Sequence, residues 1–413
     1  MFAPQPSIRV NEQGEIDFTD FFKRYKSISM QKGRDMYLAT TRHSYAQKGT
    51  TLACFGMKGS GKTTLFATMA RSVGYIENGR TYMETVIWRG RTVDYWVNFL
   101  PNGNELAKKV YVFLHEDDLK RIPHVYDADS GREFKIPPEI IITYSTVEDM
   151  LKKIKFGAIN VIYEPSVYTF SKTLALLMKR RASNELPQLD GTHIATKFWW
   201  FELFYRLVNR PALHSHKYIS IFIDEADDII PSQPGDLDWH MNAWLKDSIK
   251  DFRKSKLSLY LACHSDSDID GRIKSKIQYK IFLRGSRIPD GSLIRKDAPA
   301  FLPMGVGFID AAGWGVFTYQ KMQDFGEYIM DYDVEALVKP EDLVEGQREI
   351  KRKVYNDRKK NEWSTRKNAG KASPVSGEVN DNTLPANKEE EDGKGIKALI
   401  LSLNLKGDGG VPH

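Results

Sequence analysis

The residues best suited to do chemistry form one glycine-rich octapeptide. Residues 56–63 read Gly-Met-Lys-Gly-Ser-Gly-Lys-Thr and match the pattern G-x-x-x-x-G-K-[ST] in full. Residues without a Cβ let successive backbone N–H groups point toward several phosphate oxygens. The lysine of this pattern reaches the β- and γ-phosphates of a nucleotide, and the hydroxyl after it ligates Mg²⁺. The sequence therefore predicts a phosphate cradle, with Thr63 also on the metal, made by Gly56, Met57, Lys58, Gly59, Ser60, Gly61, Lys62, Thr63 and Thr64.

Two acids form the second set of candidate residues. Asp224 and Glu225 directly follow the apolar run 218–223. An acid at the carboxyl end of a strand lies at the edge of the sheet beside the glycine-rich loop, where Asp224 is expected to hold Mg²⁺ through its water shell. Glu225 is then placed to accept a proton from an attacking water. The alternative is that Glu225 only caps or pairs.

Two further polar candidates come later in the chain. His264 follows the apolar run 257–263 and is predicted to sense the γ-phosphate or to orient water; the alternative is an ordinary histidine at a sheet edge. Arg253 lies in the basic run 252–256. A guanidinium assists phosphoryl transfer and is often supplied in trans by a neighbouring subunit. Its alternative is a basic helix end that complements the helix dipole.

These side chains need a framework of strands and helices. An apolar run at 49–55 precedes the loop, and helical character follows at 63–73. Strands separated by helices form a parallel sheet that is covered on both faces. We therefore predict an α/β fold of the P-loop NTPase class (RecA/ASCE-like), with a mostly parallel sheet flanked by helices. Further strands are expected at 85–88, 93–99, 110–114, 140–144, 158–163, 218–223, 257–263 and 280–283, and helices from Thr146 to Gly157 and at 173–181, 198–209 and 242–254.

Composition and local character divide the chain into four expected parts. These are an N-terminal arm at 1–45, a P-loop ATPase domain at 46–335 with a β-rich insertion at about 76–140, a basic helical extension at 336–372, and a disordered linker with a short amphipathic segment at 373–413. The two cysteines exclude a disulfide scaffold and fit a reducing compartment. Because no apolar stretch approaches the ~18 residues of a membrane span, we expect no stable membrane insertion and a cytoplasmic location.

The order of these motifs resembles the HerA/FtsK family of P-loop motors. The resemblance rests on residues 56–63, Asp224-Glu225, Arg253 and His264, where the family usually has Gln. It covers about 49–75 and 218–294, including the segments 267–274 and 281–287. It implies ATP hydrolysis with Mg²⁺, a hexameric ring, and movement of duplex DNA by a viral or plasmid-encoded packaging or transfer motor. A capsid or transfer-machinery partner, and association with the virion or the host cytoplasm, are also implied.

Several alternatives stay open at this stage. The chain also resembles zonular-occludens-toxin-like assembly or secretion ATPases, and a slow nucleotide-dependent switch would need the same residues. The trans arginine is Arg253 or one of Arg272, Arg284 and Arg287. The basic run 348–371 and the cluster 88–91 each fit DNA contact, or else a solvated helix and a packing surface. ATP is favoured over GTP because no guanine-reading Asn/Thr-Lys-x-Asp element is evident in a suitable loop.

Overall fold

The computed structural model describes the following parts of the 413-residue chain: residues 8–10, 16–44, 49–91, 93–94, 96–99, 109–116, 124–127, 130–131, 133–134, 136–165, 191–210, 217–319 and 328–331. The chain divides into two compact units, of which the first comprises Met1–Val167 and Thr196–Leu337. Of the second unit, Tyr168–Ala195 and Val338–His413, the structure describes only residues 191–195. The predicted helix at 173–181, the basic extension and the linker lie outside the described residues.

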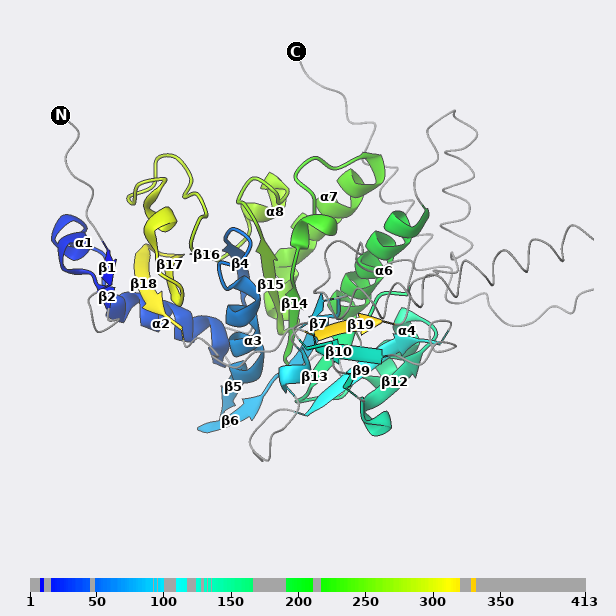
Figure 1. The fold of residues 1–413 in the computed structure, drawn as a ribbon. Coiled ribbons are helices and arrows are strands. Elements are labelled where there is room, and N and C mark those ends of the chain that lie inside the picture. The colour runs from blue at the N-terminus through cyan, green and yellow to red at the C-terminus, as the bar shows by residue number, and fades with distance from the viewer. Residues whose placement is uncertain are drawn as a thin grey trace, which may run out of the picture. The chain divides into compact units, whose positions relative to one another are not determined.

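A ten-stranded sheet forms the centre of the unit (Figure 1). Every neighbouring pair from β12 to β16 is parallel, and β17 and β18 are antiparallel at the other edge. In spatial order the strands are β12 (Ile141–Tyr144), β9 (Val110–His115), β13 (Ile159–Ile162), β7 (Thr85–Arg89), β14 (Ile219–Ile223), β15 (Leu257–Cys263), β4 (Thr51–Phe55), β16 (Tyr279–Phe282), β17 (Val306–Asp310) and β18 (Trp314–Thr318).

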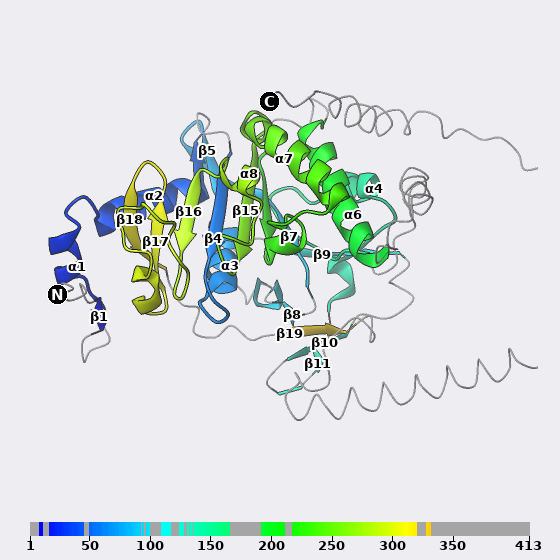
Figure 2. The same cartoon turned by 90° about the horizontal axis from the view of Figure 1, so that it is seen from above.

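The central strands are buried along their whole length. Strands β4, β7, β14 and β15 show no exposed position. Such strands have continuous apolar runs because helices cover both faces of a parallel sheet. Helix α3 lies on one face and helices α6 and α7 on the other (Figure 2). The helices are α1 (Thr19–Arg24), α2 (Met30–Thr41), α3 (Lys62–Ser72), α4 (Val147–Lys153), α6 (Gly191–Val208), α7 (Asp236–Lys254) and α8 (Gly271–Lys274).

Several helices begin where the sequence signals a start. The Thr146 hydroxyl accepts a hydrogen bond from the Asp149 N–H and caps α4, at the start predicted for this helix, which ends at Lys153 rather than at Gly157. Ser29 caps α2 in the same way, by accepting from the Lys32 N–H. Residues 1–45, expected to form an arm, thus include helices α1 and α2, and Tyr37 of α2 stacks on Phe317 of β18.

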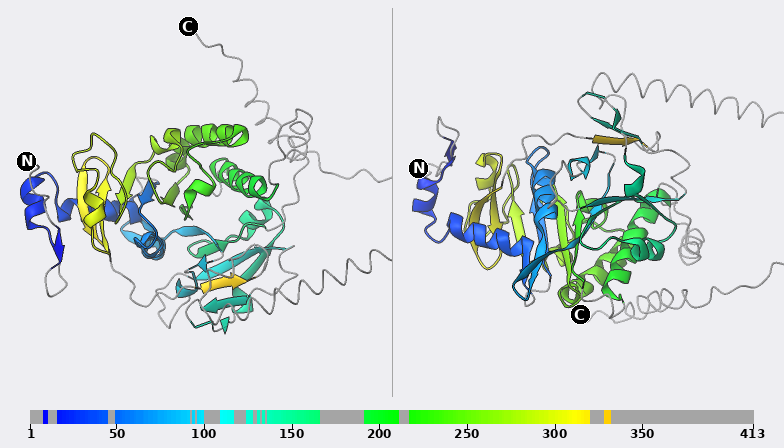
Figure 3. Two further views of the ribbon diagram at one scale, coloured as in Figure 1. Left: turned by 45° about the horizontal axis from the view of Figure 1, so that its top comes forward. Right: turned by 90° about the horizontal axis from the view of Figure 1, so that it is seen from below.

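The segment 76–140 differs from the expected β-rich insertion. It supplies β7 and β9 to the main sheet, while β8 (Val93–Asp94), β10 (His124–Asp127) and β11 (Glu133–Phe134) join β19 (Tyr328–Asp331) in a four-stranded sheet (Figure 3). The strand predicted at 93–99 ends at Asp94 and is followed by a 3₁₀ turn, Trp96–Phe99. Short apolar runs do not distinguish a central strand from an insertion, which explains the difference.

Two smaller sheets complete the described strands. Strands β3 (Arg42–Ser44), β5 (Gly74–Glu77) and β6 (Arg80–Met83) form one, and β1 (Arg9–Val10) pairs with β2 (Ile16–Asp17). Both cysteines are free and buried in central strands, and burial raises the pKa of the Cys54 and Cys263 thiols. Among the helices that the structure describes, none combines the length and the apolar character needed to cross a bilayer.

Candidate nucleotide site at the carboxyl edge of the sheet

The predicted site residues meet because their strands run in the same direction. Strands β13, β7, β14, β15 and β4 are parallel neighbours, so the segments that follow them emerge at one edge of the sheet. The glycine-rich loop follows β4, Asp224 follows β14 and His264 follows β15. Strand β7 ends in Arg89, and Glu164 lies just beyond β13.

The loop after β4 has the backbone geometry of a phosphate cradle. Gly59 and Gly61 have φ angles of 76° and 89°, in the left-handed region that glycine adopts without strain. A Cβ on Gly56 would lie 2.3 Å from the Ser60 hydroxyl oxygen, so a larger residue there would require Ser60 to move. Helix α3 begins at Lys62 and directs the free N–H groups of its first turn at the loop.

Lys62 lies inside this loop. Its ammonium donates to the carbonyl oxygens of Gly56 and Met57, at 2.8 and 3.3 Å, and its side chain is only 8% exposed. His264 Nδ1 lies 3.4 Å from the same ammonium. The structure therefore places His264 next to the lysine that is expected to reach the terminal phosphates.

Thr63 and Asp224 join the two main motifs. The Thr63 hydroxyl donates to Asp224 Oδ2 over 2.7 Å, although the two residues are 161 positions apart. A hydroxyl and one carboxylate fit Mg²⁺, which takes one or two protein oxygens and completes its shell with waters and phosphates. Within the described residues no group of three or more His, Cys, Asp or Glu side chains is placed to hold a metal. The residues present therefore fit a nucleotide-borne magnesium ion.

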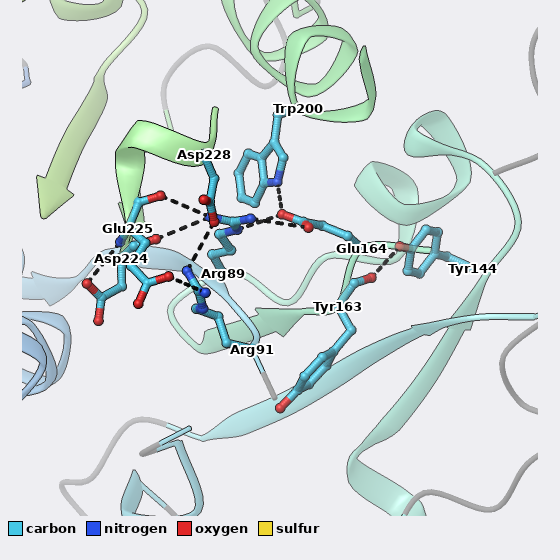
Figure 4. Close-up of polar contacts among 9 residues, drawn as sticks. All are labelled: Arg89, Arg91, Tyr144, Tyr163, Glu164, Trp200, Asp224, Glu225 and Asp228. Atoms are coloured by element: carbon cyan, nitrogen blue, oxygen red, sulfur yellow. Dashed lines mark hydrogen bonds and ion pairs between the residues drawn. The ribbon is translucent and has the colours of Figure 1, made fainter. Parts of the chain in front are cut away.

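Glu225 has an unusual backbone and a paired side chain. Its φ of 50° and ψ of 59° are left-handed, which is uncommon for a residue with a Cβ. The Asp224 carboxylate accepts a hydrogen bond of 3.0 Å from the Glu225 N–H, which helps to hold this turn. The Glu225 carboxylate forms an ion pair with Arg91 (Figure 4). Glu225 is thus paired with an arginine in this structure, and its role as a proton acceptor stays a prediction.

Arg89 is the residue at this edge that the sequence interpretation missed. Its guanidinium donates to the carbonyl oxygens of Asp224 and Glu225, at 3.3 and 3.2 Å, and to Asp228 Oδ2 at 3.2 Å. It also forms a two-pronged contact with Glu164, whose shorter arm is 2.6 Å (Figure 4). Burial by itself lowers the pKa of Arg89, and the carboxylates of Glu164 and Asp228 outweigh it and raise the pKa.

A signal for Arg89 was present in the sequence. An arginine that ends an apolar strand, Thr85–Arg89, lies at the same sheet edge as Asp224-Glu225 if β7 and β14 are parallel. The cluster 88–91 was assigned either to DNA contact or to a packing surface. The structure instead turns both of its arginines toward acids.

The candidate trans arginines lie in different settings. Arg253 belongs to the last turns of α7, and its side chain lies outside the described part of the structure. Arg272 pairs with Asp270 and covers the ring of Trp239 at 4.9 Å. Arg284 and Arg287 are exposed in the segment after β16, where the Arg284 carbonyl accepts from the Met57 N–H. A trans arginine is defined by its contact with a neighbouring subunit's site, so the choice among these four arginines is a proposal.

Sheet, loop and acid together define an α/β P-loop NTPase fold. Strand β15 lies between β4, which carries the loop, and β14, which carries Asp224. This is the RecA/ASCE-like arrangement predicted from the sequence.

Comparisons with known proteins give only distant matches. No family model and no curated protein matches the chain. A genome-packaging NTPase of Sulfolobus turreted icosahedral virus 2 is similar at 11% identity, over 66% of this chain and 98% of that one, with a TM-score of 0.32. The N-terminal domain of zonular occludens toxin from Neisseria meningitidis is similar at 12% identity, over 67% and 95% of the chains, with a TM-score of 0.25.

A bacterial conjugative coupling protein is a third similar structure. It is 14% identical over 40% of this chain and 42% of that one, with a TM-score of 0.27. These values describe a distant similarity of fold, and no conclusion about activity rests on them.

Proposed function

We propose that this protein is a magnesium-dependent ATPase that uses hydrolysis to move duplex DNA. The observation that carries the ATPase is the hydrogen bond between Thr63 and Asp224 at the mouth of the glycine-rich loop. It brings the hydroxyl and the carboxylate that a nucleotide-bound Mg²⁺ requires to one point, next to a buried lysine. The favoured reaction is ATP plus water to ADP plus phosphate.

Each residue of the site has its own role in this proposed reaction. The loop N–H groups and Lys62 bind the phosphates, and Thr63 with Asp224 holds the metal. The bound Mg²⁺ supplies neutralisation of the phosphate charge. Glu225 accepts the proton of the water whose oxygen attacks the γ-phosphorus, while the bond from that phosphorus to the bridging oxygen of ADP breaks. His264 contacts the γ-phosphate in this proposal, which is supported by its distance of 3.4 Å from the Lys62 ammonium.

The proposal that the motor moves duplex DNA comes from the sequence. The order of motifs resembles HerA/FtsK motors, whose hexameric rings pull DNA, and an arginine from a neighbouring subunit would complete each site. Arg253 is our first choice for that arginine, with Arg272, Arg284 and Arg287 as alternatives. A viral or plasmid setting, a capsid or transfer partner and a cytoplasmic site of action belong to the same proposal.

The test is the steady-state ATPase rate with and without duplex DNA, at low and at moderate salt. We expect DNA to stimulate the rate and the stimulation to fade as salt rises, because phosphate contacts release counterions. A matched sample with Lys62→Ala should show no activity under either condition. A rate that DNA leaves unchanged would remove the DNA motor and favour an assembly ATPase or a switch. A rate at background level throughout would remove the ATPase itself.

A further inference from the structure

The Asp224-Glu225 turn is held by two arginines, Arg89 and Arg91. Arg89 donates to the carbonyl oxygens on both sides of the Glu225 nitrogen and α-carbon, that of Asp224 and that of Glu225 itself. Fixing these two carbonyls fixes the left-handed backbone between them, and with it the direction of the Glu225 Cα–Cβ bond. Arg89 therefore acts on Glu225 through the main chain.

Arg89 is itself firmly anchored. Its side chain is 6% exposed, and Glu164 engages two of its nitrogens. Glu164 in turn accepts a hydrogen bond from the Trp200 indole of α6. A planar guanidinium in two-pronged contact with a carboxylate has a fixed orientation, so the Asp224-Glu225 turn is tied to the end of β13 and to α6.

Arg91 is two residues further along and acts on the side chain. It contacts the Glu225 carboxylate and also Asp228 Oδ2, the latter at 3.3 Å (Figure 4). Its side chain is 31% exposed and that of Glu225 is 42% exposed, so this pair is more accessible to water than Arg89 is. Gly90 permits the close approach of this segment, because a Cβ there would lie 2.8 Å from the Tyr163 ring.

Arg91 contacts one of the two carboxylate oxygens of Glu225, and this ion pair fixes the direction in which both oxygens point. Glu225 is therefore a better general base once its carboxylate has left Arg91 and is free to turn toward the attacking water. Asp228 makes that departure possible, because Arg91 keeps a carboxylate partner when Glu225 moves away. The exposed half of this cluster can rearrange while the buried half stays in place.

We infer that Arg89 and Arg91 divide the control of Glu225: Arg89 positions its backbone for catalysis, and Arg91 holds its carboxylate in a resting arrangement from which hydrolysis is slower. Arg89 is a positioning residue in this scheme, and Arg91 restrains the basal rate. The inference rests on the proposed role of Glu225 and adds the residues that regulate it.

The experiment compares Arg91→Gln, Arg89→Gln and Arg89→Lys in the full chain, by steady-state ATP hydrolysis, nucleotide affinity and thermal unfolding. Arg91→Gln should raise the DNA-free kcat by about two- to fivefold, the factor that a half-exposed ion pair can impose.

Arg89→Gln should lower kcat by about 10- to 100-fold at nearly unchanged nucleotide affinity, because the base is misplaced. Arg89→Lys should recover part of that loss. Arg206→Gln is the matched control for Arg91, since Arg206 is 28% exposed and pairs with Glu148 and Glu202 elsewhere.

The outcomes separate this inference from the proposed function. If Glu225→Gln abolishes turnover while Arg91→Gln has the wild-type or a lower rate, the resting arrangement is wrong and the ATPase assignment stands. If Arg89→Gln loses activity only in proportion to its loss of folded protein, or only through KM, its positioning role is wrong. If Glu225→Gln hydrolyses ATP at the wild-type rate, Glu225 is not the base and this inference falls, while the ATPase assignment stands. The rate increase in Arg91→Gln should also vanish when Glu225→Gln is added.

Discussion

Strand β7 has a polar cluster at each end, and the two clusters differ in their access to water. The amino-end cluster consists of Glu84, His43, Ser220 and Tyr260, all fully buried. Glu84 lies 2.5 Å from His43 Nδ1 and accepts a hydrogen bond of 2.5 Å from the Ser220 hydroxyl, and Tyr260 donates to the Thr40 carbonyl. The carboxyl-end cluster consists of Arg89, Arg91, Glu164, Glu225 and Asp228, of which only Arg89 is buried.

The difference shows how one strand serves two purposes. A fully buried and satisfied polar network has one low-energy arrangement, because any broken contact leaves a desolvated group unpaired. The amino-end cluster therefore fixes the positions of β3, β7, β14 and β15 relative to one another. At the carboxyl end, water can replace a lost partner, so Arg91 and Glu225 can separate at low cost. Stability is concentrated at one end of β7 and adjustable chemistry at the other.

The largest effect is expected for Glu225→Gln at the carboxyl end. Removing the proton acceptor should lower the rate of ATP hydrolysis by about 10²- to 10⁴-fold. The midpoint of thermal unfolding should hardly change, since Glu225 is partly exposed and the amide can still accept from Arg91. Single-turnover hydrolysis and calorimetric nucleotide binding measure the two halves of this prediction. Loss of nucleotide binding together with turnover would mean that Glu225 supports the fold of the site, as the amino-end residues do.

The converse result is expected for Glu84→Ala at the amino end. The free energy of unfolding should fall by about 3–5 kcal/mol, because His43 and Ser220 are left buried without their partner. A urea titration measures this loss. The kcat per folded molecule, determined at low temperature where the variant is native, should equal that of the wild type. A kcat that falls as steeply as for Glu225→Gln would show that the two ends of β7 are not separate in function.

The two clusters also mark how far the sequence can be interpreted. Three features can be predicted from local sequence: the loop of residues 56–63, the helix start at Thr146, and an apolar strand followed by Asp224-Glu225. The loop follows from the spacing of its residues, and the other two follow from residues that are neighbours in the chain. Arg89 and Glu164 are 75 residues apart, and they meet because β13 lies beside β7. The spatial order β12-β9-β13-β7-β14 departs from chain order, so these neighbours follow from packing rather than from the sequence pattern.

The same limit explains the segment 76–140. Strands β7 and β9 are buried on both faces and therefore lack the alternation that would mark a half-exposed strand. In sequence, their apolar runs look the same as the strands of a separate β-rich insertion would. Their hydrogen bonds to β13 and β14 assign them to the main sheet. Mislocating β7 also concealed Arg89, because an arginine in an insertion has no reason to meet Asp224.

The smallest effect is expected for Glu164→Gln, which removes a charge opposite Arg89 but keeps the shape of the side chain. The amide oxygen can still accept from either Arg89 or Trp200, so the free energy of unfolding should fall by only about 1–3 kcal/mol. The kcat should fall about three- to tenfold, because a less firmly oriented Arg89 lets the Glu225 backbone shift.

Ser220→Ala is the matched change at the other end of the cluster pair, since it removes one hydrogen bond to a buried glutamate. It should lower the free energy of unfolding by a similar amount, about 1–3 kcal/mol, and leave kcat unchanged. Both variants are measured by urea titration and by steady-state hydrolysis. Because their expected losses of stability are similar, a difference in kcat reports the positioning of Glu225 rather than the stability of the fold. If Glu164→Gln loses stability but keeps the wild-type kcat, the anchor of Arg89 is structural only. The control of Glu225 then lies with Arg91 alone, since that contact does not pass through Glu164.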